Sequence, residues 1–262
     1  MAESAENAAR DESPLHARAA RGRPATPRLA AMPPTWSGAS GCRNGGAHRL
    51  LVFGARRSGS SYLVSLLRAD PRVLMHGEML HVRDLRDAHD GWAGAGALPP
   101  EEVFDVRRRN PQPLLDYIAC HPEGRRAVGF KVFHDHTRVQ NWPVLARWCD
   151  VCVLLRREDQ LAQYASLLHA RQTGRWKGRS TRHGALPVVD PRNASFVDWR
   201  AKQERWYAAI ARVMEHRLRR RDVAGVVHLT YETHLAGARG PNLTTLTRAL
   251  GLERRRERRS TA

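Results

Sequence analysis

The chain has 262 residues and a formal net charge of +18 at pH 7, and 41 of its 44 basic residues are arginine. This length suits one domain with a substantial core, and the charge favours phosphorylated or otherwise acidic ligands. No apolar run approaches the ~20 residues that span a bilayer, and residues 1–48 lack the apolar stretch of a secretory signal. The four cysteines are too few and too scattered for a disulfide scaffold. Cys149 and Cys152 form a C-x-x-C, but the apolar run at 151–155 favours a buried strand there.

Composition divides the chain into three parts. Residues 1–47 are rich in Ala, Pro and Arg and poor in Val, Ile and Phe, a composition typical of disorder. Residues 48–252 carry the apolar runs from which a folded domain can be built, and residues 253–262 form a short basic tail. We therefore expect one folded domain over 48–252 with a disordered segment before it.

In chain order, the pattern of apolar residues predicts alternating strands and helices. Strands are expected at 49–54, 73–75, 127–133, 151–155 and 223–231, and helices at 60–68, 160–172, 198–221 and 243–250. The stretches 84–113 and 173–192 are expected to be loops, the first with a short helix near 103–109. Because strands alternate with helices, we predict an α/β fold in which helices flank a parallel sheet in three layers.

The strongest motif lies between the first predicted strand and the first predicted helix. Residues 53–62 read FGARRSGSSY, a glycine-rich turn that would point backbone N–H groups and a helix N-terminus at an anion. Gly54 and Gly59 have the spacing of the nucleoside-triphosphate loop G-x-x-x-x-G-K-[ST], but Ser60 replaces its lysine. That lysine reaches the β- and γ-phosphates, so the turn suits an anion better than it suits γ-phosphoryl transfer. The turn adds a cation and three hydroxyls, from Arg57, Ser58, Ser60 and Ser61.

Three segments together resemble sulfotransferases that use 3′-phosphoadenylyl sulfate (PAPS). The run from Arg57 to Leu63, RSGSSYL, is similar to their 5′-phosphosulfate loop. Residues 153–167, in which arginines end a strand and Ser166 lies on the following helix, are similar to their 3′-phosphate segment. The chemistry agrees, because an arginine and a serine can hold a phosphate from two sides. Residues 230–232, Thr-Tyr-Glu, are a weaker third match, and residues 162–176 resemble the bacterial carbohydrate branch typified by trehalose sulfotransferase.

The resemblance covers residues 49–252 and implies a P-loop-like sulfotransferase fold. It also implies transfer of the sulfuryl group from PAPS to a hydroxyl of a carbohydrate or glycolipid, with adenosine 3′,5′-bisphosphate (PAP) as product and no metal. The expected nucleotide-binding residues are Arg57, Ser58, Gly59, Ser60, Ser61, Tyr62, Arg156, Arg157, Ser166, Lys177 and Gly178. Arg156 and Arg157 compete for the 3′-phosphate, and spacing does not choose between them. Tyr62 either stacks on adenine or packs in the core.

Sulfuryl transfer needs a base for the acceptor hydroxyl and positive charge for the sulfuryl and leaving oxygens. By resemblance, Glu78 is the general base, Lys131 touches the sulfuryl group and Arg57 meets the leaving oxygen. His134 and His136 follow the third predicted strand and are the rival bases.

Two other classes of protein remain as alternatives. A P-loop-type nucleotide kinase would share the strand, loop and helix but needs the missing lysine. A basic nucleic-acid-binding protein would account for the charge, yet the sequence has no zinc-ligand spacing and no RNA-binding aromatic signature. The expected compartment is the cytoplasm by default, with the Golgi lumen as the alternative because many eukaryotic sulfotransferases are lumenal.

Overall fold

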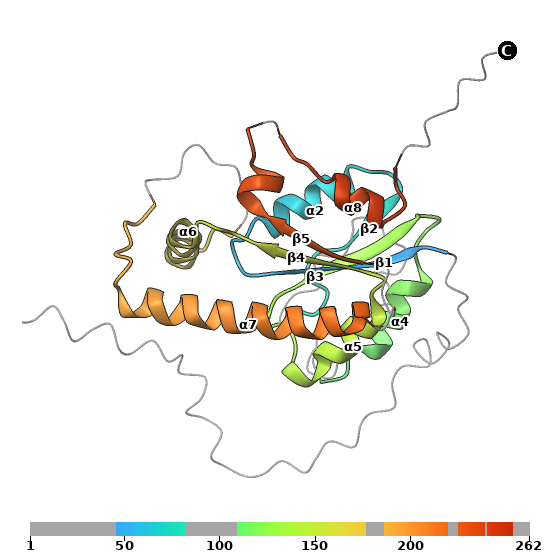
Figure 1. Ribbon diagram of the computed structural model, residues 1–262, viewed down its shortest axis with the longest axis horizontal. Coiled ribbons are helices and arrows are strands. Elements are labelled where there is room, and N and C mark those ends of the chain that lie inside the picture. The colour runs from blue at the N-terminus through green and yellow to red at the C-terminus, as the bar shows by residue number, and fades with distance from the viewer. Residues whose placement is uncertain (1–45, 82–108, 177–185, 220–224, 239, 254–262) are drawn as a thin grey trace, which may run out of the picture. The chain divides into compact units, whose positions relative to one another are not determined.

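The computed structural model describes residues 46–81, 109–176, 186–219, 225–238 and 240–253. Within them, helices flank a sheet of five strands in the order β2-β3-β1-β4-β5 (Figure 1). The strands are β1 (His48–Gly54), β2 (Val73–Met75), β3 (Ala127–Val132), β4 (Val151–Arg156) and β5 (Gly225–Thr230). The helices are α2 (Ser60–Arg68), α4 (Gln112–Cys120), α5 (Trp142–Trp148), α6 (Gln160–Thr173), α7 (Ala194–Arg219) and α8 (Thr244–Ala249). Every pairing between neighbouring strands is parallel, so the predicted α/β fold with three layers is confirmed.

The strands read as continuous apolar runs because both faces of the sheet are covered. Alternate side chains of a strand point to opposite faces. On β1, Leu50 and Val52 join the cluster formed with α2 and α8. Phe53 points the other way, and its ring lies 5.0 Å from that of Trp142 on α5. Figure 1 accordingly shows α2 and α8 on one face, and α4, α5 and α7 on the other.

The predicted strands and the helices α2 and α6 are confirmed, and α7 begins at Ala194 rather than 198. The helices α4 and α5 were not predicted. Each has a proline in its first turn, a favourable place for it, Pro113 in α4 and Pro143 in α5, although proline in a sequence usually indicates a break. Cys149 and Cys152 are free and buried, which confirms the buried strand in their segment.

Several predictions lie outside the described residues. These are the disordered segment up to residue 45, residues 84–108 of the loop at 84–113 with most of its short helix near 103–109, residues 177–185 of the loop at 173–192, and the tail from 254. No helix in the described part of the chain is long and apolar enough to cross a membrane.

A close approach between β1 and β3 gives a test of the sheet. A Cβ on Gly129 would lie 2.3 Å from the backbone oxygen of Leu50, which cannot move without disturbing the central strand. We expect Gly129→Ala to lower the free energy of unfolding by about 1–3 kcal/mol, the usual cost of overpacking. Gly225→Ala on β5 is the matched control, because its Cβ would make ordinary 3.9 Å contact with Ala249. Urea unfolding measures the free energy of unfolding of both variants. Equal losses in the two variants would contradict this account.

Candidate functional site

The candidate site lies at the carboxyl ends of the strands, the edge at which open parallel sheets bind ligands. The turn from β1 into α2 is tight. The amide of Ser58 donates to the carbonyl of Ala55 at 3.2 Å, and both Arg57 (φ 65°) and Gly59 (φ 89°) have left-handed backbone. Two reasons require glycine at position 59. Its backbone is left-handed, and a Cβ there would lie 2.3 Å from the ring of Tyr231. We call residues 55–61, the turn and the first residues of α2, the anion loop.

The anion loop offers hydrogen-bond donors to a negatively charged group. Helix α2 starts at Ser60 without a side-chain cap, so its N-terminal amides point out of the helix beside the turn. The hydroxyl of Ser58 is completely buried, and its oxygen has no hydrogen-bond partner. A buried hydroxyl without a partner is costly, and a bound anion would satisfy it.

Arg57 connects the anion loop to helix α6. Its Nε donates to Ser166 Oγ at 2.9 Å, and its Nη1 donates to the carbonyl of Trp176 at 2.6 Å. Burial, and then the charge of Arg157, lower the pKa of Arg57 below its ordinary value. Arg57, Arg157 and Ser166, all predicted nucleotide-binding residues, therefore meet in one place, where two guanidinium groups would be stabilised by an anion.

The two adjacent arginines at the end of β4 face different partners. Arg156 makes a double hydrogen bond to Glu204 of α7, at 2.7 and 2.9 Å, and lies over the ring of Tyr207. Arg157 turns to the anion loop, where its Nη1 lies 3.4 Å from the carbonyl oxygen of Arg57. The partners of Arg156 and Arg157 therefore differ, a distinction that the spacing of the sequence could not make.

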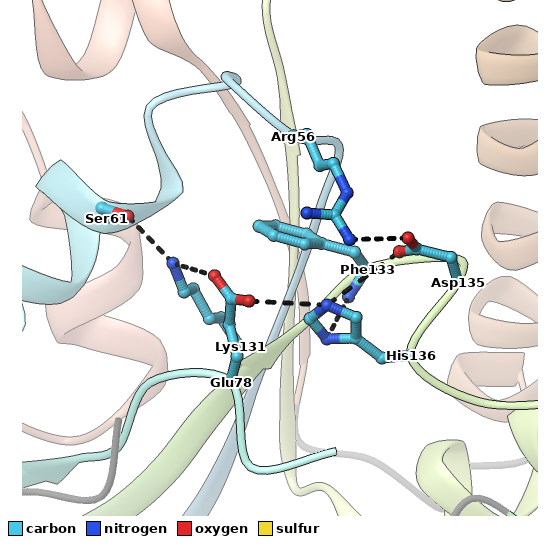
Figure 2. A network of polar contacts seen from close by, with 7 residues as sticks. All are labelled: Arg56, Ser61, Glu78, Lys131, Phe133, Asp135 and His136. Atoms are coloured by element: carbon cyan, nitrogen blue, oxygen red, sulfur yellow. Dashed lines mark hydrogen bonds and ion pairs between the residues drawn. The ribbon is translucent and has the colours of Figure 1, made fainter. Parts of the chain in front are cut away.

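A second group of charges lies beside the anion loop (Figure 2). The ammonium of Lys131, which is 3% exposed, contacts Glu78 Oε1 at 2.9 Å and donates to Ser61 Oγ at 2.9 Å. Glu78 follows β2 and Lys131 lies on β3, and these strands are neighbours in the sheet. Topology therefore brings the predicted base against the predicted sulfuryl-contacting lysine, and the lysine against the start of α2.

His136 extends this group away from the anion loop. Its Nε2 lies 3.5 Å from Glu78 Oε2 and 3.9 Å from Asp135 Oδ1. Asp135 in turn pairs at 2.7 Å with Arg56, whose guanidinium lies 5.7 Å from the ring centre of Trp176. Figure 2 shows the continuous row of charged and polar side chains that results.

Burial lowers the pKa of both rival histidine bases. Burial is the main cause that lowers the pKa of His136 to about 3, with His81, Arg56 and Lys131 adding to it and Asp135 opposing. A neutral imidazole with so low a pKa is a weak base. Burial also lowers the pKa of His134, whose ring lies edge-on to Trp206 at 5.5 Å, and no contact joins it to Glu78 or Lys131 in the described part of the chain.

The remaining predicted residues differ in position. Tyr62 packs against the apolar cluster between α2, α8 and the sheet, which favours its role in the core. Lys177 and Gly178 lie outside the described residues. Sequence reasoning did not single out Arg56 or Asp135, because a lone charge in a loop carries no spacing signal.

Glu78, His81 and His136 are of metal-ligating types, and one ligand atom from each lies within 4.8 Å of the others. The other oxygen of Glu78 is already paired with the ammonium of Lys131, whose charge would repel a divalent cation. The neighbouring ammonium therefore disfavours a divalent cation at this cluster.

The buried neutral state of His136 predicts a pH-dependent stability. The unfolded chain protonates this histidine below about pH 6.5, whereas the folded chain keeps it neutral down to about pH 3, so stability falls as the pH falls through this window. One such group accounts for about 2 kcal/mol between pH 7 and pH 5. In urea unfolding at both pH values, His136→Gln should therefore lose about 2 kcal/mol less than the wild type. Equal losses would mean that His136 is not held neutral.

Comparison with known proteins identifies a curated relative. No protein-family model matches the chain. The chain is 30% identical over 145 residues to Nodulation protein H of Rhizobium tropici, a match covering 53% of each chain. The chain therefore spans about half the length of this curated relative. The similarity supports a sulfotransferase family without distinguishing its branches.

Proposed function

We propose that the protein is a sulfotransferase that moves the sulfuryl group of PAPS to an acceptor hydroxyl. One observation carries the proposal: an anion loop with serine in place of the triphosphate-loop lysine touches a glutamate–lysine pair through Ser61. The loop can hold an anion, and the pair offers a base and a cation beside it. The similarity to Nodulation protein H supports the same class of enzyme.

The residues present fit a nucleotide with phosphates at both ends of its ribose. The donors of the anion loop, including the buried Ser58 hydroxyl, would hold the 5′-phosphosulfate. Arg157 and Ser166 would hold the 3′-phosphate, because both lie against Arg57 and Arg156 does not. Arg57 lies between these two subsites and can contact either charged group.

The side chains around the transfer divide the work. PAPS supplies the activated sulfuryl group and a phosphate leaving group. Glu78 takes the proton of the acceptor hydroxyl, and Lys131 holds Glu78 in place while its charge faces the sulfuryl oxygens. Arg57 stabilises the charge that develops on the leaving oxygen. His136 lies against Glu78 and limits the directions in which the carboxylate can turn.

The acceptor is proposed as a carbohydrate or glycolipid hydroxyl, following the family resemblance. Arg56 contacts both the half-exposed ring of Trp176 and the carboxylate of Asp135, and so brings them beside the proposed transfer site. Aromatic faces with nearby carboxylates suit sugars, which present both apolar C–H faces and hydroxyls.

Nucleotide binding gives the first test. PAP should raise the melting temperature of the protein more than ATP does, because the anion loop lacks the lysine for a γ-phosphate. Arg57→Ala should weaken PAP binding by about tenfold or more, since a charged donor is lost. Arg156→Ala is the matched control and should bind PAP normally, because this arginine is engaged with Glu204. Equal shifts with PAP and ATP, or no PAP shift, would contradict the proposal.

Turnover gives the second test. Glu78→Gln keeps an oxygen for Lys131 but cannot accept the hydroxyl proton, so sulfuryl transfer should fall by roughly 10²-fold with PAP binding nearly unchanged. Radiolabelled sulfuryl transfer to a panel of carbohydrate acceptors measures the rate. His134→Asn is the comparison variant and should retain most activity. If His134→Asn lost activity while Glu78→Gln kept it, the histidine would be the base.

A further inference from the structure

The chain makes an unusual turn directly after β5. Residues Tyr231–Leu235 form one turn of π-helix, closed by the amide of Ala236 donating to the carbonyl of Tyr231 at 2.8 Å. Such wide turns are rare and often occur at functional sites. Here the turn presents Tyr231 and Glu232 to the segments that follow β1 and β4. Neither residue has a role in the function proposed above.

Tyr231 packs between the two phosphate-binding segments. Its ring fills the space that a Cβ on Gly59 would need, and the guanidinium of Arg157 lies 5.0 Å from its ring centre. An arginine stacked on an aromatic ring loses part of its freedom. Tyr231 therefore limits where Arg157 can lie relative to the anion loop.

Glu232 fixes the same arginine from another side. Its carboxylate accepts hydrogen bonds from the backbone amides of Glu158 at 2.9 Å and Asp159 at 3.2 Å, the residues that follow Arg157 and lead into α6. Its Oε1 also lies 3.6 Å from Arg157 Nε, a buried atom that has no hydrogen bond. The contact is made through Nε, on the stem side of the guanidinium, and leaves the terminal Nη1 directed at Arg57.

Arg156, the neighbouring arginine, is paired with a different carboxylate, that of Glu204. Glu204 of α7 holds the terminal nitrogen of Arg156 in a double hydrogen bond. Each of the two adjacent arginines thus has its own glutamate. Glu204 occupies the end of its arginine, whereas Glu232 braces the stem of its arginine and the backbone beyond it.

We propose that Glu232 is a positioning residue that holds Arg157 toward Arg57 and Ser166, and so sets the selectivity for nucleotides that carry a 3′-phosphate. This inference rests on the proposed function. Without the carboxylate, the turn into α6 loses two hydrogen bonds and Arg157 loses its ionic brace. Contacts to the 3′-phosphate should weaken, while those of the anion loop with the 5′ group should persist.

The test compares two nucleotides that differ in one phosphate. Calorimetry on the full chain gives the dissociation constants of PAP and of AMP, which lacks the 3′-phosphate. Glu232→Gln should weaken PAP binding by about tenfold and change AMP binding by less than about twofold, as expected for one charge-assisted contact. Glu204→Gln is the matched control and should change neither constant. Arg157→Lys removes the guanidinium that Glu232 braces and should repeat the loss of PAP selectivity.

Each alternative result overturns the proposal in a recognisable way. Equal weakening of PAP and AMP by Glu232→Gln would make Glu232 a residue of the fold only, and tighter PAP binding would make it a competitor of the phosphate. Selectivity lost in Glu204→Gln instead would assign the 3′-phosphate to Arg156. If Glu232→Gln did not fold, normal PAP selectivity in Arg157→Lys would still refute the inference. A wild-type protein that bound PAP no better than AMP would refute the nucleotide assignment of the proposed function itself.

Discussion

An ammonium group buried in a protein must have a counter-ion close by, because leaving it unpaired costs several kcal/mol. Lys131 is such a group, and Glu78 is its counter-ion. Since the two residues belong to neighbouring parts of the sheet edge, their pairing fixes the loop after β2 against the end of β3. The same ammonium binds Ser61, so the beginning of α2 is held as well. The need to pair the buried ammonium of Lys131 thus fixes the positions of Glu78, Lys131 and the anion loop relative to one another.

A different constraint governs the other half of the site. Arg57 and Arg157 carry like charges at close quarters, and the carboxylate of Glu232 contacts Arg157 only through its Nε, 3.6 Å away, in the described part of the chain. Like charges held together are tolerated where the surrounding structure fixes them and a ligand of opposite charge completes the site. Ser166 and Tyr231 supply much of that fixation. Among the described arginines, Arg156 is neutralised by Glu204, whereas Arg57 and Arg157 face each other and would be neutralised by the proposed ligand.

Much of the fold was accessible from the sequence because buried parallel strands are unmistakably apolar. The run at 151–155 and the turn at Gly59 each carry a strong local signal, and β4 and α2 lie where those signals indicated. Helices α4 and α5 were missed because a proline beside a helix start looks like a break when viewed without the tertiary contacts around it. Those contacts include the Trp148 indole, which donates to the carbonyl of Leu115 at 2.8 Å.

The site was accessible in part. The glycine and serine pattern gave the anion loop, but the partners of each side chain depend on the order of strands, which no local pattern records. The sequence could not show that Lys131 would touch Glu78, or that two consecutive arginines would diverge. Arg156 is the last residue of β4 and Arg157 the first after it, and their side chains reach different partners where the strand ends.

The contact between Gly59 and Tyr231 joins the first strand–helix connection of the sheet to the last strand. A chain emerging from the ribosome makes the anion loop early, but it lacks the aromatic ring that packs on this loop until β5 and the π-helical turn have been synthesised. The anion loop is therefore completed late, after most long-range contacts of the sheet have formed. In the proposed function, nucleotide binding would report on the completed sheet rather than on a local segment, and a partly assembled fold would not sequester the nucleotide.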